Sequence, residues 1–261
     1  MYELELFAGA GGGILGKNLI GLTTVGAVEI EPYCRRVLLA RQRDQCLPCF
    51  PIWDDVTSFS IANPDTRAYF EWLLTIRDRL CISGGFPCQD ISSSGSGAGL
   101  GGKKSGLWFE MARIIGEIRP KVAFVENSPM LSSRGLEGVL ASLAEMGYDA
   151  KWCVLGAGHL NYPLKRDRIW ILGERDQDNV RMDAAPRAQR NVFEGYIWSS
   201  ETIRAMSDAD PDRLVADGYA LRDPDGLAGI VDRVKAIGNG QVPAVAAVAW
   251  EILTGGIYDK E

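Results

Sequence analysis

Histidine is almost absent from this sequence, and basic residues are outnumbered by acidic ones. The single histidine is His159, so histidine-rich metal sites and most Ser-His or Cys-His catalytic pairs are disfavoured. Six cysteines among 261 residues are too few for a disulfide framework, so a functional cysteine would be a nucleophile or a ligand. The net charge of −6 argues against a strongly basic nucleic-acid coat protein, although a local basic cleft is still compatible with it.

Long apolar runs and the pattern of a signal peptide are also missing. The longest apolar stretch, residues 242–250, is far shorter than the roughly 18–20 residues of a membrane-spanning helix. Glu3 and Glu5 lie where a signal peptide would carry basic residues. Hydrophobic residues make up 46 % of the chain, which is enough for a sizeable core. We therefore expect a globular protein of the cytoplasm with no membrane span.

Strand and helix patterns alternate through residues 2–173. Such alternation predicts an α/β fold with a mostly parallel sheet and helices on both faces. In sheets of this kind, ligands bind beyond the carboxyl ends of the strands. The expected strands are 2–7, 23–29, 80–83, 121–125, 150–156 and 168–173, and the expected helices are 14–20, 33–43, 65–80, 107–118 and 136–146.

The regular pattern stops near residue 174 and returns at residue 234. Between them, short apolar islands lie among Asp-Pro, Asp-Gly and arginine-rich stretches. We therefore expect one domain built from residues 1–174 and 234–261. We expect residues 175–233 to be a small irregular region between its two parts.

A glycine-rich turn follows the first expected strand. Gly9, Gly11 and Gly12 would let backbone N–H groups approach a ligand closely, although a tight turn of any α/β protein has the same composition. Glu29 lies about 20 residues beyond Gly9, at the end of the second strand, where an acidic residue accepts hydrogen bonds from ribose hydroxyls. Asp55 follows a third expected strand tip, where it could bind an adenine amino group or cap the turn of residues 57–60.

Cys88 lies in the sequence Gly-Gly-Phe-Pro-Cys-Gln, residues 84–89. Proline fixes the backbone there, and the glycines remove steric cover, so the thiol is expected to be presented rather than packed. A buried core cysteine is the commoner role of this residue type. The neighbours are unlike those of a core, which favours a nucleophile.

Five segments of the chain resemble, in order, the motifs of the DNA cytosine-5 methyltransferases. They are ELFAGAGG (5–12), GFPCQ (85–89), VEN (125–127), KRDR (165–168) and GNG (238–240). The resemblance covers residues 2–174 and 234–253. It implies a Rossmann-like methyltransferase fold, S-adenosylmethionine as methyl donor with S-adenosylhomocysteine as product, and a cytosine flipped out of double-stranded DNA. Residues 175–233 would then be a short target-recognition region.

The chemistry explains why the family needs these residue types. Carbon 5 of cytosine is a poor nucleophile until a thiolate adds to carbon 6, which is the role that the resemblance implies for Cys88. Negative charge then develops at N3, and a carboxyl group holding a proton relieves it. By resemblance that group is Glu126, Arg168 contacts the base at O2, and Arg166 supports the covalent intermediate. The alternative for Glu126 is an exposed strand-end carboxylate, which would be favoured if Cys88 were absent. The alternative for Arg166 and Arg168 is an ordinary pair of arginines that leads into a strand.

Further residues are expected to contact the cofactor or the substrate. Residues 92–105 are rich in glycine and serine, and we expect a lid there rather than a passive loop. Cys46 and Cys49 have no second pair and no suitably placed histidine, so no metal is expected. The implied cofactor contacts are Phe7, Ala8, Ile30, Val56, Leu107, Asn239 and Gly240, and the implied substrate contacts are Pro87, Gln89, Ser92, Lys103, Lys104 and Asn127.

The sequence departs from the family pattern in three places. Family members carry a longer variable region and a supporting segment that is not visible here. Leu164 stands where a glutamine usually precedes the arginine pair, and Ser128 replaces the valine after Glu126-Asn127. Neither of these two substitutions touches an atom that should make or break bonds. Compact enzymes of this pattern resemble those of bacterial viruses, and a partner chain for target recognition is left open.

The leading function is therefore methyl transfer to carbon 5 of cytosine in double-stranded DNA. A non-catalytic DNA-binding or regulatory relative is the first alternative, although Cys88, Glu126 and Arg168 are all present. An RNA cytosine-5 methyltransferase would use the same chemistry. A nicotinamide-dependent dehydrogenase accounts for the first glycine turn and for nothing after it.

Overall fold

A single sheet organises the part of the chain that the computed structural model describes, namely residues 1–87, 106–160, 162, 166–175 and 240–255. Strands and helices alternate along these residues, as the sequence pattern predicted. The strands are β1 (Tyr2–Leu6), β2 (Thr23–Val28), β3 (Ile52–Trp53), β4 (Leu80–Gly85), β5 (Val122–Asn127), β6 (Tyr148–Gly156) and β7 (Asp167–Arg175).

The strand order is β3-β2-β1-β4-β5-β7-β6. Neighbours from β3 through β5 are parallel, whereas β7 runs antiparallel to both β5 and β6. The prediction of a mostly parallel sheet is confirmed. Because β7 is reversed, it begins beside the carboxyl end of β5, where Asn127 pairs with Ile169. Residues that follow β1, β2, β4 and β5 therefore meet the residues that precede β7 at one edge.

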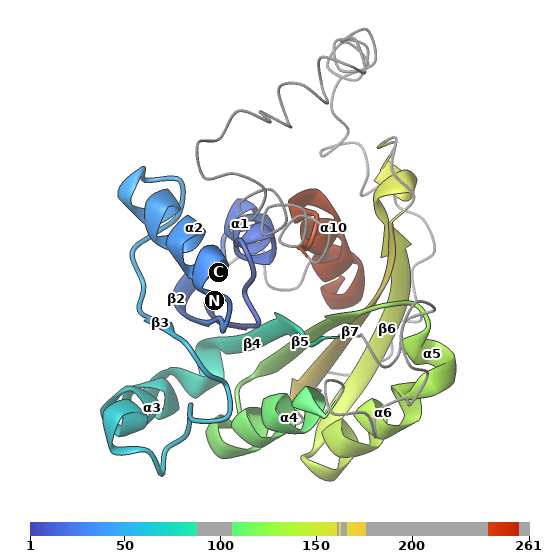
Figure 1. Ribbon diagram of the computed structural model, residues 1–261. Helices are drawn as coiled ribbons and strands as arrows, with labels where there is room; N and C mark the ends of the chain where they lie inside the picture. The colour runs from blue at the N-terminus through green and yellow to red at the C-terminus, as the bar shows by residue number, and fades with distance from the viewer. Residues whose placement is uncertain (88–105, 161, 163–165, 176–239, 256–261) are drawn as a thin grey trace, which may run out of the picture.

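Helices cover both faces of the sheet, as predicted. Helices α1, α2 and α10 lie on one face, and α3, α4 and α6 lie on the other (Figure 1). None of the described helices combines the length and apolar character required to cross a membrane. The helices are α1 (Gly12–Leu19), α2 (Pro32–Arg43), α3 (Pro64–Ile76), α4 (Leu107–Ile118), α5 (Leu131–Arg134), α6 (Leu136–Glu145) and α10 (Pro243–Thr254), with 3-10 turns η1 (Arg77–Arg79) and η3 (Ala157–Leu160).

Helix α3 shows how local chemistry sets a boundary that periodicity misses. The expected helix ran from residue 65 to residue 80, but the α-helix ends at Ile76 and the 3-10 turn η1 follows. At its start, the Asn63 side chain accepts a 3.1 Å hydrogen bond from the backbone N–H of Asp65. Pro64 occupies the first helical position, where its missing N–H is not needed.

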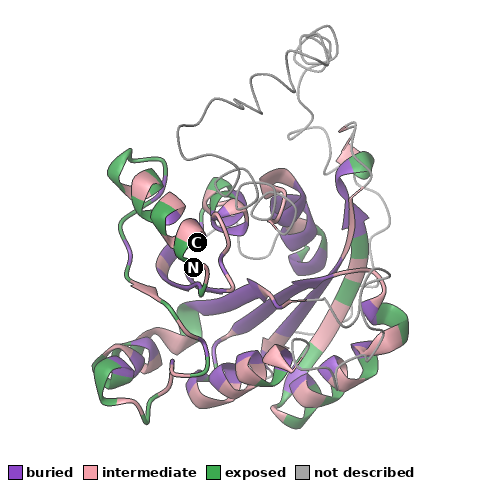
Figure 2. Cartoon of the chain, in the orientation of Figure 1, coloured by how far each residue is buried: buried purple, intermediate pink, exposed green. Residues whose placement is uncertain are grey.

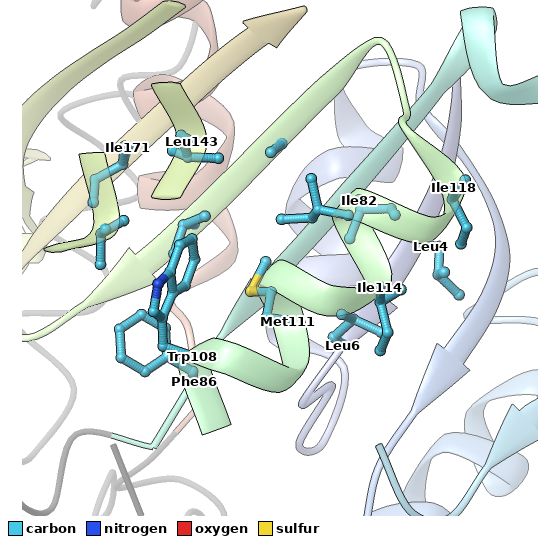
Figure 3. Packing of buried hydrophobic residues seen from close by; sticks show 14 of the residues in the cluster. Leu4, Leu6, Ile82, Phe86, Trp108, Met111, Ile114, Ile118, Leu143 and Ile171 are labelled. Atoms are coloured by element: carbon cyan, nitrogen blue, oxygen red, sulfur yellow. The ribbon is translucent and has the colours of Figure 1, made fainter. Parts of the chain in front are cut away.

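The larger core lies between the sheet and helices α3, α4 and α6. Trp108, Met111 and Ile114 of α4 are fully buried, and Figure 3 shows Trp108 beside Phe86 and Ile114 beside Leu6 of the sheet. These residues recur along the sequence at the intervals of one helix face, as expected for the helix predicted over residues 107–118. The core therefore fixes α4 against β1 and β4, close to their carboxyl ends.

The opposite face is closed by α10. The Phe124 ring of β5 stacks on Trp170 of β7 at 5.5 Å and meets Trp250 of α10 edge-on at 5.3 Å. Burial is continuous along the middle strands, whereas the exposed residues gather on the outer sides of the helices and on β6 (Figure 2). The C-terminal helix is thus part of the core of the sheet.

Helix α1 approaches the start of α10 through glycines. A Cβ atom at Gly12 would overlap the backbone carbonyl of Gln241, and one at Gly16 would overlap that of Pro243. Only glycine leaves room for backbone at this distance. The glycine run after β1 therefore has a packing role as well as its place in the turn.

A buried cluster of charges lies between α1 and the sheet. The Lys17 Nζ atom lies 2.9 Å from Glu3 Oε1 and 2.7 Å from Glu5 Oε2, and all three side chains are buried. The Ser83 hydroxyl donates to both carboxylates, and the Thr24 hydroxyl donates to Glu3 at 2.8 Å. Burial raises the pKa of Glu3 to about 7, although Lys17 opposes that shift. One lysine thus compensates two buried carboxyl groups.

Replacing Lys17 with methionine should lower the free energy of unfolding by about 3–5 kcal/mol near neutral pH, because the carboxyl groups lose their cation. Chemical denaturation of both proteins measures the difference. The matched control is Lys151→Met, since within the described residues that ammonium donates only to the Leu253 carbonyl, at 3.4 Å. It should change stability by about 0.5 kcal/mol or less. Equal stability of Lys17→Met and wild type would contradict the role of the cluster.

Candidate active site

The loop after β1 has an unusual backbone. Phe7, Gly9 and Gly11 adopt φ angles of 55°, 54° and 85°, which lie in the left-handed region. Phe7 is the only one of the three that carries a side chain, and such a conformation stores strain that is common at ligand sites. Alternating left-handed residues turn successive backbone N–H groups toward one side. The loop therefore suits a polar ligand at the edge of the sheet.

Glu29 closes this loop from β2. Its Oε2 atom accepts a 2.6 Å hydrogen bond from the Gly9 N–H, and its Oε1 atom accepts one of 2.7 Å from the Glu31 N–H. Burial raises the pKa of Glu29, and the two N–H donors oppose the shift. Each oxygen keeps a second lone pair for ribose hydroxyls. Ile30 is 64 % exposed beside it, which fits an apolar wall for a planar ring.

Asp55 and Val56 lie in the turn after β3. The Asp55 Oδ1 atom accepts hydrogen bonds from the Thr57 N–H at 2.9 Å and from the Thr57 hydroxyl at 2.8 Å, so it caps the turn. Val56 is buried, and the Arg113 guanidinium of α4 donates to its carbonyl at 2.9 Å. Capping and adenine binding involve different edges of the Asp55 carboxylate, so the expected cofactor contact stays a prediction.

The other expected cofactor residues are divided between the loop and the core. The Ala8 N–H donates to the Val28 carbonyl at 3.1 Å. A Cβ atom at Gly11 would lie 2.8 Å from the Leu38 side chain and 3.3 Å from the Leu47 side chain. Leu107 packs on the core at the start of α4. Gly12 faces the backbone of Gln241. Their contacts with a cofactor remain predictions.

Asn127 connects the end of β5 to the segment after β4. It is 2 % exposed, its Nδ2 atom donates to the Phe86 carbonyl at 3.0 Å, and its Oδ1 atom accepts from the Ser128 N–H at 2.8 Å. The Phe86 ring is also buried, with its centroid 5.6 Å from that of Trp108. The chain is thereby fixed immediately before Pro87. This placement gives Asn127 a positioning role, and its expected substrate contact remains a prediction.

Glu126 is a second buried carboxyl group at this edge of the sheet. Its Oε1 atom lies 2.7 Å from Arg168 Nε, and the residue is 8 % exposed. Gly85 is its register partner in β4, and a Cβ atom there would overlap Glu126 Oε2. Burial raises the pKa of Glu126, whereas Arg168, Arg166 and a hydrogen bond from Gln241 oppose the shift. Such a carboxyl group can hold a proton more readily than an exposed one.

The two arginines act on different partners. Arg168 pairs with Glu126 and also donates from Nη1 to the Asp167 carbonyl at 2.8 Å. Arg166 donates from Nη2 to the Gly240 carbonyl at 2.6 Å, which ties the start of β7 to the segment before α10. Both contribute to the electrostatic environment of Glu126. The structure thus brings Glu126, Arg166, Arg168 and Gly240 together.

Several expected site residues lie outside the described residues. They are Cys88, Gln89, Ser92, Lys103, Lys104 and Asn239. Most of the region 175–233 lies outside them as well, so the expected domain division stays a prediction. In the described ranges, no group of three or more His, Cys, Asp or Glu residues could hold a metal ion.

Two residues of the site were not identified from the sequence. Gly85 stood out only as part of a motif, yet its lack of a side chain makes room for the Glu126 carboxyl group. Gln241 was not singled out, although its side chain reaches Glu126. The available signal was a polar residue in an unusual place: Gln241 lies between Gly238-Asn239-Gly240 and Val242-Pro243, just before an apolar helix.

Comparison with known proteins places these features in a family. The model of the C-5 cytosine-specific DNA methylase family matches residues 1–223. The type II methyltransferase M.HhaI of Haemophilus parahaemolyticus is 29 % identical over 82 % of this chain and 59 % of its own length. M.DsaV of Dactylococcopsis salina is 31 % identical over 69 % of this chain and 47 % of its own length. The chain spans about half the length of the curated relatives it matches.

Solved structures share the fold. The Dnmt2 methyltransferase of S. pombe superposes with a TM-score of 0.52 at 16 % identity, covering 68 % of this chain and 50 % of that one. A DNMT2 mutant of Spodoptera frugiperda gives a TM-score of 0.51 at the same identity, covering 73 % and 53 %. At this identity the likeness establishes the architecture, and the family match establishes the relationship. The chain belongs to the C-5 cytosine-specific DNA methylase family.

Proposed function

We propose that this chain transfers a methyl group from S-adenosylmethionine to carbon 5 of a cytosine flipped out of double-stranded DNA. The observation that carries the proposal is the buried Glu126 carboxyl group, paired with Arg168 beside the segment that leads into Pro87 and Cys88. Membership of the methylase family supports it. The proposal includes a covalent bond between Cys88 and the base.

The loop after β1 and the Glu29 carboxylate fit the adenosine part of the cofactor. Glu29 is oriented by two backbone N–H groups and retains lone pairs for the ribose hydroxyls. Ile30 and Val56 would contact the adenine ring, Asp55 its amino group, and Asn239 with Gly240 the methionine end. S-adenosylmethionine supplies the methyl group as an electrophile on a positively charged sulfur atom.

Cys88 and Glu126 would divide the activation of the base between them. The thiolate forms a bond to carbon 6 while N3 takes a proton from Glu126, so electron density moves onto carbon 5. After carbon 5 has been methylated, its proton passes to solvent, the bond between sulfur and carbon 6 breaks, and N3 returns its proton to the Glu126 carboxylate. The thiolate is thereby restored, and the aromatic ring is recovered.

Arg168 has a positioning role in this scheme. Its Nε atom holds Glu126 Oε1 at 2.7 Å, which keeps the carboxyl group at the edge of the sheet. Contact of Arg168 with O2 of the base is part of the proposal. So are Gln89, Ser92, Lys103 and Lys104 as groups that meet the extruded nucleotide, and residues 175–233 as the region that reads the target bases.

A trapping experiment tests the covalent step. The protein is incubated with S-adenosylmethionine and duplex DNA that contains 5-fluorocytosine. Fluorine at carbon 5 blocks elimination, so we expect an adduct that survives denaturing electrophoresis. DNA of varied sequence is used, because the recognised bases are not specified by the fold.

Cys88→Ala is the control for this experiment and should form no adduct. An RNA duplex of the same sequence should give less adduct, whereas preference for RNA would indicate an RNA methyltransferase. Absence of adduct and of methylation on every DNA tested would overturn the proposal and favour a non-catalytic DNA-binding relative.

Substitution Glu126→Gln should lower the methylation rate about 10²–10⁴-fold, since the amide cannot deliver a proton to N3. Binding of S-adenosylmethionine, measured by calorimetry, should persist, because Glu126 is not among the proposed cofactor contacts. Single-turnover kinetics on duplex DNA measure the rate. Unchanged turnover would refute the role of this carboxyl group.

Substitution Gly85→Ala should lower the same rate about 10²-fold, because the added methyl group displaces the Glu126 carboxyl group. Gly173→Ala in β7 is the matched control, since the nearest atoms to a Cβ atom there would be side-chain atoms of Leu143 and Tyr148 at 3.4 Å or more. Full activity of Gly85→Ala would show that Glu126 does not need its present position.

A further inference from the structure

Gln241 lies between α1 and the catalytic edge of the sheet. A Cβ atom at Gly12 would overlap the backbone carbonyl oxygen of Gln241, and a Cβ atom at Gly13 would overlap its side-chain oxygen. The preceding residue, Gly240, is held by Arg166 through a 2.6 Å hydrogen bond to its carbonyl. The position of Gln241 is therefore set by glycines on one side and by an arginine on the other.

The side-chain amide of Gln241 donates a hydrogen bond to the Glu126 carboxylate. Both groups lie above Gly85, where a Cβ atom would overlap Glu126 Oε2 and approach Gln241 Nε2 to 3.3 Å. The Arg168 side chain holds the other carboxylate oxygen. Glu126 is thus held from two sides, by β7 and by the residue two places before α10.

The amide oxygen of Gln241 is also buried, and it accepts no hydrogen bond from the described residues. Glu5 Oε1 is its neighbour, since a Cβ atom at Gly13 would lie 2.3 Å from the Gln241 oxygen and 2.6 Å from Glu5 Oε1. The charged groups that act on Glu126 are Arg168 and Arg166 at the start of β7 and Glu5 of β1. Gln241, in contrast, carries no charge and acts on Glu126 through a hydrogen bond.

We propose that Gln241 is a positioning residue for Glu126, and this inference rests on the proposed function. An amide carries a donor and an acceptor, so it can hold the carboxyl group in either protonation state. It presents its N–H to the ionised form and, after rotation of the amide, its oxygen to the protonated form. Glu126 can then release and regain a proton without leaving its place. Arg166 contributes by fixing Gly240.

The test measures the titration of Glu126 directly and independently of methylation. The protein is labelled with 13C at the glutamate side-chain carboxyl carbon, and the Glu126 signal is identified by its loss in Glu126→Gln. In Gln241→Met, which keeps the length of the side chain but not its polar atoms, the carboxylate loses a donor. Its pKa should therefore rise by about one unit or more.

The same variant should lower the single-turnover methylation rate about 10- to 100-fold, with KM for S-adenosylmethionine unchanged. Gln42→Met is the matched control. The Gln42 amide donates to the Phe50 carbonyl at 3.0 Å, so this variant also loses one hydrogen bond from a glutamine side chain. It should change neither the titration of Glu126 nor the rate. Thermal unfolding compares the stability of the two variants.

Gln241→Glu provides a second signature if Gln241→Met folds poorly. The new carboxyl group can donate to Glu126 while it is protonated and repels Glu126 once it is ionised. Methylation by this variant should therefore approach that of wild type at low pH and fall more steeply as the pH rises. A pH profile parallel to that of wild type would contradict the proposal.

The Glu126 titration distinguishes failure of this inference from failure of the proposed function. An unchanged Glu126 signal in Gln241→Met, in a protein that methylates DNA, overturns the inference alone. A shifted Glu126 signal in Gln241→Met, when the wild-type protein methylates no DNA, supports the contact and overturns the proposed function.

Discussion

Close packing between α1 and the segment before α10 is the constraint on which the rest of the site depends. Glycines at positions 12 and 16 let α1 lie directly against the backbone of Gln241 and Pro243. This contact brings a late part of the sequence to the loop after β1. As a result, the edge that carries Glu29 and Glu126 also receives Gly240 and Gln241. A larger residue at either glycine would separate the two halves of the site.

The arrangement of charge follows from the same packing. Both faces of the sheet are covered, so the polar residues of β1, β4 and β5 have no solvent to face. Lys17 compensates Glu3 and Glu5, whereas Arg168 compensates Glu126. Glu3, Glu5 and Glu126 are therefore arranged in two separately compensated sets. Gln241 lies between these sets and adds hydrogen-bonding capacity without adding charge.

Much of the fold could be predicted from the sequence, because period-two and helical patterns describe the local elements well. The alternation of Glu3 and Glu5 with apolar residues was a weaker guide, since it is typical of a half-exposed strand and both acids are buried. The reversal of β7 depends on pairing between distant strands, which no local pattern encodes. The motifs identified Glu126 and Arg168, but the contact between Gln241 and Glu126 could not be predicted, because it depends on how α10 meets α1.

The late position of Gln241 in the chain has a consequence for synthesis. A nascent chain can form β1 to β5 and the core against α4 before residues 240–255 leave the ribosome. Until then Glu126 lacks one of its two partners, and the Phe124 ring lacks the edge-on contact with Trp250 of α10. Translation therefore completes the carboxyl environment and the protective cover of the sheet in a single late event.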